Sequence, residues 1–327
     1  MKYVSGWAEA AKTLVMTGGT SGFGRRAVER LLRTRPEWRV ILLARDPQRA
    51  DNLIVQARDR VRVVAADLAS LESIDHACDG VVRLVGRGGF HALSLNAGIQ
   101  GVGADSPSHD GYELTFAVNH LAHYAIAGRL MPSLVPRGRV VITGSEVHDP
   151  DAFCLMGIAR ATWQDPAELA DVRLSQMHMP AGVERGEARY SASKLLNVMH
   201  ARLLARELPS AGVVSFNPSV VPGTDIARGR NVLQQWSWKY VLPLAAPILP
   251  GMRSMERSAS DLVWLLTEAD IYGRCGAYIN GTTEEPGSAE SRDASKIARM
   301  RAVSERLIAE ARARSRTATL RRVNARR

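Results

Sequence analysis

Cysteine is scarce in this sequence, which limits the ways in which the fold can be held together. The 327-residue chain has three cysteines, an odd number, at the widely separated positions 78, 154 and 275. Their spacing fits neither a disulfide framework nor a zinc site. We therefore expect a fold that depends on its hydrophobic core, and a reducing, cytoplasmic setting is the simplest interpretation.

Long apolar runs are also absent. The first twelve residues, MKYVSGWAEAAK, lack the apolar stretch of a signal peptide. The most apolar later segment, residues 240–252, is short and is interrupted by Pro243, Pro247 and Pro250. A helix needs about 20 consecutive apolar residues to span a bilayer, so the sequence predicts no transmembrane segment.

Acidic residues are missing from the C-terminal segment 311–327, which contains seven arginines. The whole chain carries a net charge of +10, and without these arginines the charge would be +3. Such a segment could bind nucleic acid or an anionic membrane, but no aromatic residue lies between its arginines, as single-strand binding would favour. We therefore expect a flexible, solvated tail without a specific nucleic-acid partner, following a single domain over residues 1–310.

Short β-branched runs alternate with amphipathic segments of helical length along most of the chain. This order is typical of an α/β protein with helices on both faces of a parallel sheet. We predict a doubly wound Rossmann fold with about seven parallel strands and a ligand crevice at their carboxyl ends. The predicted strands are residues 13–16, 40–43, 61–65, 92–95, 139–143, 213–217 and 277–279. The predicted helices are residues 22–33, 71–85, 112–134, 191–207 and 258–268.

Two long segments, residues 146–189 and 222–257, interrupt this alternation. Long connections at the carboxyl edge of a sheet often form binding loops or lids. The second segment concentrates Trp236, Trp238 and Tyr240 among aliphatic residues. It could therefore cover a lipophilic substrate, or it could simply extend the core.

Glycines cluster directly after the first predicted strand, in the run Thr17-Gly18-Gly19-Thr20-Ser21-Gly22-Phe23-Gly24. Gly18, Gly22 and Gly24 allow the backbone to turn tightly and to approach a pyrophosphate at the N-terminus of the next helix. Glycine-rich loops also occur in ordinary turns, but a position between the first strand and the first helix favours dinucleotide binding. We expect the whole loop, including Thr20, Ser21 and Phe23, to bind the cofactor.

The second predicted strand ends in Ala44-Arg45-Asp46. Proteins that select NAD usually place an acidic residue here, where it binds the ribose 2′-hydroxyl. Ala44 provides no acid, and Arg45 offers a planar cation suited to the 2′-phosphate of NADP. An arginine that simply faces solvent is the alternative, but the sequence favours NADP as the cofactor.

These motifs, together with others further along the chain, resemble the short-chain dehydrogenase/reductase family over residues 12–300. The glycine loop matches the TGxxxGxG motif of the family, and Tyr190 with Lys194 matches its YxxxK motif. The resemblance places the catalytic asparagine and serine at Asn119 and Ser145. It also identifies further cofactor-contacting residues, which are Asp67, Leu68, Asn96, Ala97 and Gly98.

After the sixth predicted strand the sequence departs from the family pattern. Pro218, Val221 and Thr224 correspond to cofactor-contacting positions, but the usual Pro-Gly pair is Pro218-Ser219 and the threonine is displaced to position 224. The overall pattern is closest to the protochlorophyllide-reductase-like and retinol-dehydrogenase-like groups. Val220 stands where the protochlorophyllide photoenzymes have a cysteine, which counts against that narrower identity.

Tyr190 and Lys194 are suited to moving a proton during hydride transfer to a carbonyl. The substrate oxygen needs a proton, which Tyr190 can donate, or accept in the reverse direction. A free phenol has a pKa near ~10, but Lys194 lies one helical turn away and its positive charge favours the phenolate. Ser145 can donate a hydrogen bond to the substrate oxygen. The resemblance implies that Asn119 holds a water that links Lys194 to solvent, and that Lys194 contacts the nicotinamide ribose.

Several histidines could suggest a metal site, but their neighbours do not support one. His120, His123 and His148 share no ligand spacing with acidic residues or cysteines, so we predict no metal. His148 and Cys154 lie early in the segment 146–189 and are candidates for lining a substrate pocket.

The sequence therefore predicts an NADP(H)-dependent oxidoreductase that transfers a hydride between nicotinamide and a carbonyl or alcohol of a hydrophobic small molecule. Reduction of a conjugated C=C bond is a neighbouring alternative. A sensor or scaffold that binds NADP without turnover is an alternative of another class, although such proteins generally lack an intact Tyr–Lys pair. A homodimer is one candidate for the oligomeric state.

Overall fold

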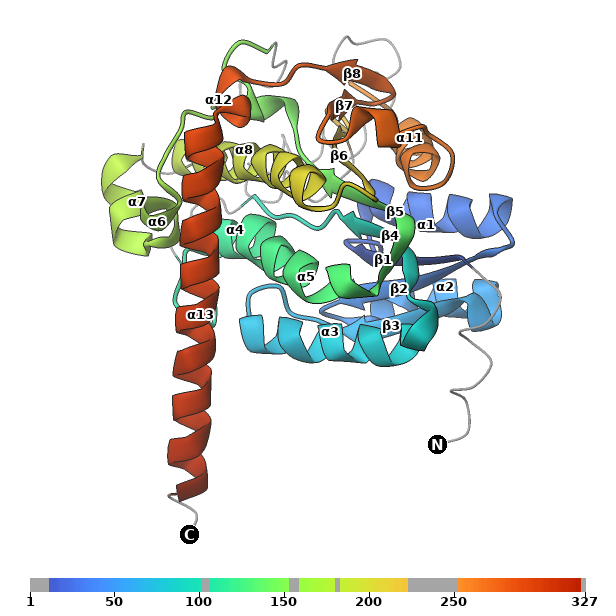
Figure 1. Ribbon diagram of the computed structural model, residues 1–327, viewed down its shortest axis with the longest axis horizontal. Coiled ribbons are helices and arrows are strands. Elements are labelled where there is room, and N and C mark those ends of the chain that lie inside the picture. The colour runs from blue at the N-terminus through green and yellow to red at the C-terminus, as the bar shows by residue number, and fades with distance from the viewer. Residues whose placement is uncertain (1–11, 101–105, 153–158, 180–182, 223–251, 325–327) are drawn as a thin grey trace.

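The computed structural model describes residues 12–100, 106–152, 159–179, 183–222 and 252–324. Their centre is one sheet of eight strands (Figure 1). The strands are β1 (Lys12–Thr17), β2 (Trp38–Ala44), β3 (Val61–Ala65), β4 (Phe90–Leu95), β5 (Leu134–Thr143), β6 (Gly212–Asn217), β7 (Tyr278–Asn280) and β8 (Thr283–Glu285).

The order of the strands defines a doubly wound sheet, which confirms the predicted fold class. The order is β3-β2-β1-β4-β5-β6-β7-β8, and neighbouring strands are parallel except for the antiparallel pair β7 and β8. From β1 the chain first adds strands on one side and then returns to add β4 on the other. This reversal opens a crevice at the carboxyl ends of β1 and β4, where such folds bind their ligands.

The eighth strand is one more than the sequence pattern indicates. β8 is a three-residue Thr-Glu-Glu segment at the edge of the sheet. Gly281, with φ of 63°, provides the left-handed turn that joins it to β7. A polar strand of this length has no hydrophobic alternation, so sequence periodicity cannot reveal it.

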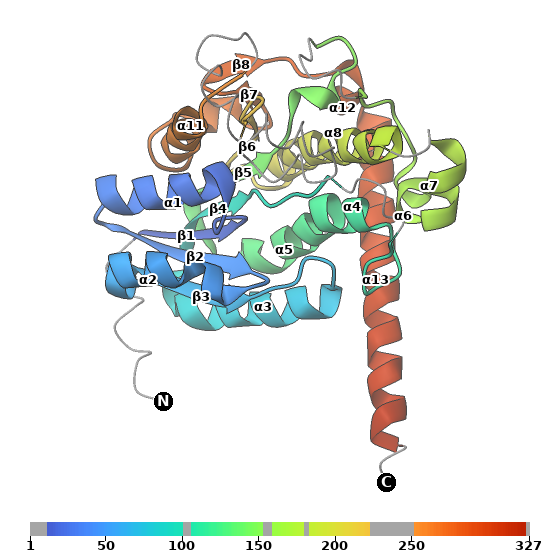
Figure 2. The ribbon, with the colours of Figure 1, turned by 180° about the vertical axis from the view of Figure 1, so that it is seen from behind.

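Alternate residues of the strands pack into two core clusters, one on each face of the sheet. In β1, Val15 belongs to the cluster that includes side chains of α3, α5, α8 and α13, whereas Leu14 and Met16 belong to the cluster that includes side chains of α1, α2 and α11. Figures 1 and 2 show these two helix layers from opposite sides. The helices are α1 (Gly22–Thr34), α2 (Asp51–Ala57), α3 (Leu71–Val85), α4 (Leu114–Phe116), α5 (Ala122–Leu130), α6 (Pro166–Ala170), α7 (Val172–His178), α8 (Val183–Glu207), α11 (Met255–Thr267), α12 (Ala289–Arg292) and α13 (Ala294–Asn324).

The predicted helix over residues 112–134 is divided into several parts. A π-helical turn over Ala117–Leu121 separates α4 from α5. After α5 the chain forms a short 3₁₀ turn over Met131–Ser133 and enters β5. Pro132 lies in that turn, and because a proline lacks the N–H of a regular helix, it favours the end of α5 at this point.

The C-terminal segment differs from the flexible tail that its charge suggested. Helix α13 continues to Asn324, and at spacings of three and four residues it buries one apolar face against α8, α6 and α3. The side chains of this face are Ile297, Met300, Val303, Leu307 and Ala311. Residues 311–317 therefore extend a packed helix.

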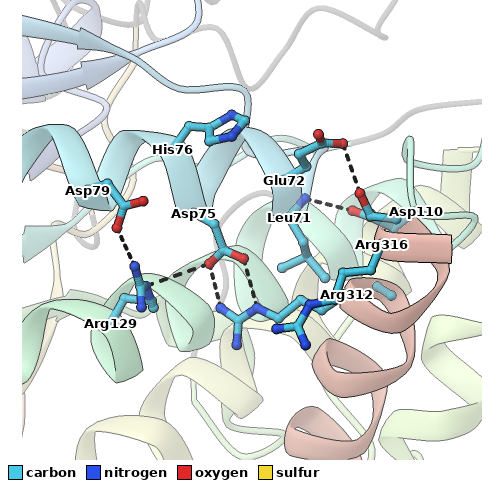
Figure 3. Close-up of a pocket in the computed structure, with 11 residues that line it drawn as sticks. Leu71, Glu72, Asp75, His76, Asp79, Asp110, Arg129, Arg312 and Arg316 are labelled. Atoms are coloured by element: carbon cyan, nitrogen blue, oxygen red, sulfur yellow. Dashed lines mark hydrogen bonds and ion pairs between the residues drawn. The ribbon is translucent and has the colours of Figure 1, made fainter. Parts of the chain in front are cut away.

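Ion pairs attach this part of α13 to α3 (Figure 3). Arg312 donates to both carboxylate oxygens of Asp75, from Nε at 2.8 Å and from Nη2 at 2.5 Å. Arg129 of α5 reaches Asp75 at 3.8 Å and also pairs with Asp79. Arg314 donates to the hydroxyl of Tyr112 at 3.0 Å. Asp75 of α3 thus neutralises Arg312 of the tail. The polar hollow of about 380 Å³ between the two helices is part of this docking surface.

Candidate active site

The glycine loop between β1 and α1 closes tightly against the end of β4. A Cβ atom at Gly24 would lie 2.2 Å from the carbonyl oxygen of Gly18, and Gly18 has φ of 68°. The Asn96 side chain donates to the same carbonyl at 3.1 Å. Glycine is therefore required at these two positions by a close approach and by a left-handed backbone.

Thr17 and the Asn96-Ala97 pair hold this loop at the switch point of the sheet. The hydroxyl of Thr17 accepts hydrogen bonds from the backbone N–H groups of Asn96 at 2.9 Å and Ala97 at 3.1 Å. Ser21 occupies the N-cap of α1 without a capping hydrogen bond from its side chain, and the first turn has no acidic residue. The exposed N–H groups and the dipole of this helix end suit an anion such as a pyrophosphate. Phe23 lies on the other side of the turn and packs edge-on against Phe216, with ring centroids 6.4 Å apart.

We expect Gly24→Ala to weaken dinucleotide binding at least tenfold, because the new methyl group would displace either the Gly18 carbonyl or the Asn96 side chain. Isothermal titration with NADPH measures the effect. Gly128→Ala is the matched control, since Gly128 also lies in a helix and no heavy atom stands within 4 Å of its added Cβ. Equal affinity in both variants would show that the loop does not carry the cofactor.

Arg45 and Asp67 follow the adjacent parallel strands β2 and β3 and lie at the same edge of the sheet. Arg45 is exposed, and Asp67 is half-buried. One oxygen of Asp67 accepts from the backbone of Ala69 at 3.0 Å, and the other lies 3.3 Å from the His109 ring. Leu68 packs against the core. The structure thus brings together the residues that the sequence assigned to the adenosine end of a cofactor.

Asn119 lies in the π-helical turn and is fully buried. Its side chain pairs with both backbone groups of Ile99, accepting from the N–H at 2.8 Å and donating to the carbonyl at 2.9 Å. It also donates to the hydroxyl of Ser193 on α8 at 3.0 Å. Asn119 therefore joins the chain after Gly98 to the helix that carries Tyr190.

Lys194 and Tyr190 lie on one side of α8, facing the ends of β4 and β5. The ammonium nitrogen of Lys194 is 5.4 Å from the centre of the Tyr190 ring and donates to the carbonyl of Thr143 at 3.1 Å. A Cβ atom at Gly98 would lie 3.5 Å from that nitrogen and 3.4 Å from Asn119 Oδ1. A glycine at this position therefore keeps the space in front of both side chains open.

Burial is the largest influence on the pKa values of Lys194 and Tyr190. It lowers the pKa of Lys194 to about 8, so the ammonium is retained below that pH. Burial raises the pKa of Tyr190 above its usual value, and the negative charge of Glu146 raises it further. A hydrogen bond from Ser145 acts in the opposite direction and favours the phenolate. Ser145 itself begins a short 3₁₀ turn over Glu146–His148 at the end of β5.

His123 is a site residue that sequence reasoning missed. Its Nε2 lies 3.1 Å from the Thr17 hydroxyl, and its Nδ1 lies 3.0 Å from the backbone carbonyl of Asn119. Thr17 already accepts two N–H groups, so its own proton points to His123 Nε2, and the Nδ1–H then donates to Asn119. Burial lowers the pKa of His123 to about 3, so the ring is neutral. Its position four residues after Asn119 is the only signal in the sequence.

The predicted substrate residues have a different outcome. His148 is buried and uses both ring nitrogens within the protein: Nδ1 binds the carbonyl of Ser145 at 2.7 Å, and Nε2 accepts from the backbone of Ser288 at 3.1 Å. His148 therefore stabilises the turn that begins at Ser145, and neither of its ring nitrogens is available to a substrate. Four other predicted residues, Cys154, Thr224, Trp236 and Trp238, lie outside the described residues.

The turn after β6, where Pro218-Ser219 replaces the usual Pro-Gly pair, keeps the backbone conformation that a glycine would favour. Ser219 adopts φ of 63°, the left-handed region that the usual glycine would favour. The carbonyl of Pro218 accepts a hydrogen bond from Ser258 on α11 at 2.8 Å, and Val221 is buried. The turn after β6 is therefore retained without its glycine.

Comparison with known proteins supports the family resemblance. Residues 12–153 match the family model described as short chain dehydrogenase. The short-chain dehydrogenase iccH of Talaromyces variabilis is 25% identical over 87% of this chain and 92% of its own. These matches support assigning the chain to the short-chain dehydrogenase/reductase family.

Further similar proteins align over most of the chain. A candidate daunorubicin C-13 ketoreductase, DnrU, of Streptomyces sp. (strain C5) is 28% identical over 88% of this chain and 90% of its own. The NADPH-bound carbonyl reductase from chicken fatty liver superposes with a TM-score of 0.58 at 18% identity, covering 84% of this chain and 97% of that protein. The Streptomyces protein supports the family resemblance by its sequence. The chicken enzyme shows only that the two folds are alike.

The similarity to short-chain dehydrogenases/reductases supports an oxidoreductase with a nicotinamide cofactor. The closed glycine loop, the uncapped start of α1 and the space kept by Gly98 in front of Lys194 fit such a dinucleotide. Among the described residues, no cluster of three or more histidines, cysteines or carboxylates is arranged to hold a metal ion. Within the same residues, no helix is long and apolar enough to cross a membrane.

Proposed function

We propose that this oxidoreductase uses NADP(H) to interconvert a small carbonyl compound and its alcohol, with Tyr190 as the general acid and base. The observation that supports this most strongly is the arrangement around Gly98. Tyr190 and Lys194 from α8, Ser145 from the end of β5 and Asn119 from the π-helical turn surround the open space there. The name of the Streptomyces relative, a candidate ketoreductase, agrees with carbonyl chemistry.

Each side chain has a separate part in this proposal. The cofactor, when bound, supplies or accepts the hydride. Tyr190 gives a proton to the substrate oxygen during reduction and takes it back during oxidation. Ser145 stands beside the phenol and donates a hydrogen bond to the oxygen on which negative charge develops. Because a hydrogen bond already links Ser145 to Tyr190, the substrate oxygen can contact both groups.

Lys194 and Asn119 support the proton transfer. The ammonium of Lys194 is fixed by the Thr143 carbonyl and lowers the cost of forming a phenolate at Tyr190. Asn119 anchors the strand end after Gly98 and, through Ser193, the first turns of α8. We assign it the role of keeping Lys194 and the cofactor loop in register.

A hydrophobic substrate and a homodimer remain predictions from the sequence. The aromatic residues that suggested a lipophilic cover, Trp236 and Trp238, lie outside the described part of the chain. The direct test of the reaction is the loss of NADPH absorbance with a panel of aldehydes, ketones and conjugated enones. Turnover of the aldehydes or ketones supports the proposal, whereas turnover of the enones alone would replace it with C=C reduction.

Selection of NADP is the second part of the proposal, and Arg45 supports it. We expect Arg45→Asp to weaken NADPH binding roughly 10- to 100-fold, because a charged hydrogen-bond donor is replaced by a group that repels phosphate. NADH binding should stay equal or improve. The Kd values from fluorescence titration with both cofactors measure the preference. Arg87→Asp is the control, since Arg87 is also exposed but precedes β4 at the opposite edge of the sheet. An unchanged preference in Arg45→Asp would contradict this role.

A further inference from the structure

Among the described residues, two hydrogen-bond routes connect the glycine loop with helix α8, and both begin at the hydroxyl of Thr17. The first route runs through Asn96, whose N–H donates to Thr17 Oγ1 at 2.9 Å and whose side-chain oxygen accepts from the Thr143 hydroxyl at 3.1 Å. The carbonyl of Thr143 then accepts from the ammonium of Lys194 at 3.1 Å. This route therefore ends at one member of the Tyr–Lys pair.

The second route runs through His123 on α5. Its Nε2 lies 3.1 Å from the Thr17 hydroxyl, and its Nδ1 lies 3.0 Å from the carbonyl of Asn119. The side chain of Asn119 donates to the Ser193 hydroxyl at 3.0 Å, and this hydroxyl donates to the carbonyl of Tyr190 at 2.6 Å. The second route therefore reaches α8 at the other member of the pair.

The protons along the second route have one consistent arrangement. The two lone pairs of the Thr17 hydroxyl accept the N–H groups of Asn96 and Ala97, so its single proton is left for Nε2 of His123. The ring is fully buried, which disfavours its charged form. A neutral ring that accepts at Nε2 carries its proton on Nδ1, and this proton is donated to the carbonyl of Asn119. Each group thus fixes the orientation of the next.

The two nitrogens of His123 contact different parts of the site. Nε2 holds Thr17, which ends β1 directly before Gly18. Nδ1 holds the backbone of the π-helical turn that carries Asn119. One ring can therefore fix the glycine loop at one end and the asparagine turn at the other.

His120 shows that a buried histidine in this turn does not need such contacts. It lies three residues before His123 and is equally buried, but its Nε2 lies 2.9 Å from the hydroxyl of Ser304 on α13. Its ring packs between Phe116 and Tyr124, with centroids 5.5 and 6.0 Å away. His120 thus joins the turn to the last helix, whereas His123 joins it to the glycine loop.

We infer that His123 is a positioning residue that holds the glycine loop through Nε2 and the turn of Asn119 through Nδ1. This inference rests on the proposed function and deepens it, because it assigns the two bonds to different steps. The Nε2 bond supports the affinity for the cofactor. The Nδ1 bond supports proton transfer at Tyr190, because Asn119 and Ser193 connect this turn to the catalytic helix.

Two substitutions separate the two bonds. The amide of a glutamine side chain reaches about as far as Nε2, so His123→Gln keeps a partner for Thr17 and loses the bond to Asn119. We expect an unchanged Kd for NADPH and a loss of about tenfold in kcat at saturating NADPH. The amide of asparagine reaches about as far as Nδ1, so His123→Asn should raise the Kd about tenfold and keep kcat. Fluorescence titration and steady-state kinetics with a carbonyl substrate measure the two constants.

The split between the two constants distinguishes positioning from general damage to the fold. His123→Leu, which loses both bonds, should change the Kd and kcat together. His120→Leu is the matched control, and we expect it to lower the melting temperature while the folded enzyme keeps both constants. Equal changes in the two leucine variants would overturn the inference. Glutamine and asparagine variants that change the same constant, or neither constant, would also overturn it.

A measurement on the wild type needs neither turnover nor a folded variant. Nitrogen NMR of the protein with isotope-labelled histidine should show a neutral His123 ring with its proton on Nδ1, assigned through the contact of the ring with Thr17. A proton on Nε2 would overturn the inference, whatever the substrate proves to be. Failure of every carbonyl substrate, with the proton on Nδ1 and the expected change in the Kd of His123→Asn, would instead contradict the proposed function.

Discussion

Tyr190→Phe is expected to reduce turnover by about 10²–10⁴-fold while leaving the Kd for NADPH nearly unchanged. The substitution removes only the phenolic oxygen, which the structure places beside Ser145, and keeps the buried ring 5.4 Å from the Lys194 nitrogen. Steady-state kinetics with a carbonyl substrate measures the loss, and fluorescence titration measures cofactor binding. A variant with near wild-type turnover would contradict the assignment of Tyr190 as general acid.

Tyr124→Phe is the control for this experiment. Tyr124 lies on α5, where its hydroxyl donates to Glu305 of α13 at 3.3 Å, so the same chemical change is made away from the strand ends. We expect this variant to retain wild-type kcat. An equal loss in both variants would indicate a general loss of folded enzyme.

Acid should unfold this protein steeply, between about pH 3 and pH 5, because three buried histidines cannot accept protons in the folded state. Burial lowers the pKa of His120 and of His123 to about 3 and that of His200 well below its usual range. Above pH 6.5 these rings are neutral in both the folded and the unfolded chain, so they do not affect the free energy of unfolding. As the pH falls below 6.5, the unfolded chain takes up protons that the folded chain does not.

The size of the effect follows from this difference in protons. Below pH 6.5 each histidine lowers the free energy of unfolding by about 1.4 kcal/mol per pH unit. The three histidines together therefore lower it by about 4 kcal/mol per pH unit. A typical domain is stable by about 5–15 kcal/mol. Urea unfolding at pH 7 and at pH 5.5 measures the change in free energy of unfolding.

His200→Phe should reduce this dependence on pH by about a third. The His200 ring stacks on Tyr124 with centroids 4.8 Å apart, and its Nδ1 binds no described residue, so phenylalanine replaces it with little loss. His178→Gln, at an exposed position, is the control. An unchanged slope in His200→Phe would mean that this ring is protonated in the folded state.

The sequence predicted the sheet and the order of the motifs well, because these depend on local patterns. The predicted strand over residues 61–65 matches β3, since three valines in five residues favour an extended strand. The strand at residues 139–143 matches only the second half of β5. Its first half, Leu134–Arg137, contains a proline and an arginine with φ of 57°, so its sequence does not show the pattern of a regular strand.

Features that depend on contacts between distant segments were not predictable. The π-helical turn around Asn119 has the same hydrophobic spacing as an ordinary helix, and only its bonds to Ile99 and Ser193 distinguish it. The assignment of residues 311–327 to a solvated tail rested on their charge alone and did not consider Asp75 of α3, which pairs with Arg312.

Helix α13 has a consequence for the way in which this protein is made. The apolar faces of α5 and α8, which carry or adjoin Asn119, Tyr190 and Lys194, are completed by side chains between Ile297 and Ala311. A ribosome synthesises the chain from its N-terminus, so these faces stay uncovered while more than a hundred residues after α5 are added. During that interval the nascent chain presents an apolar groove where chaperones can bind and other nascent chains can aggregate. The last helix thus sets the earliest moment at which these apolar faces can be covered.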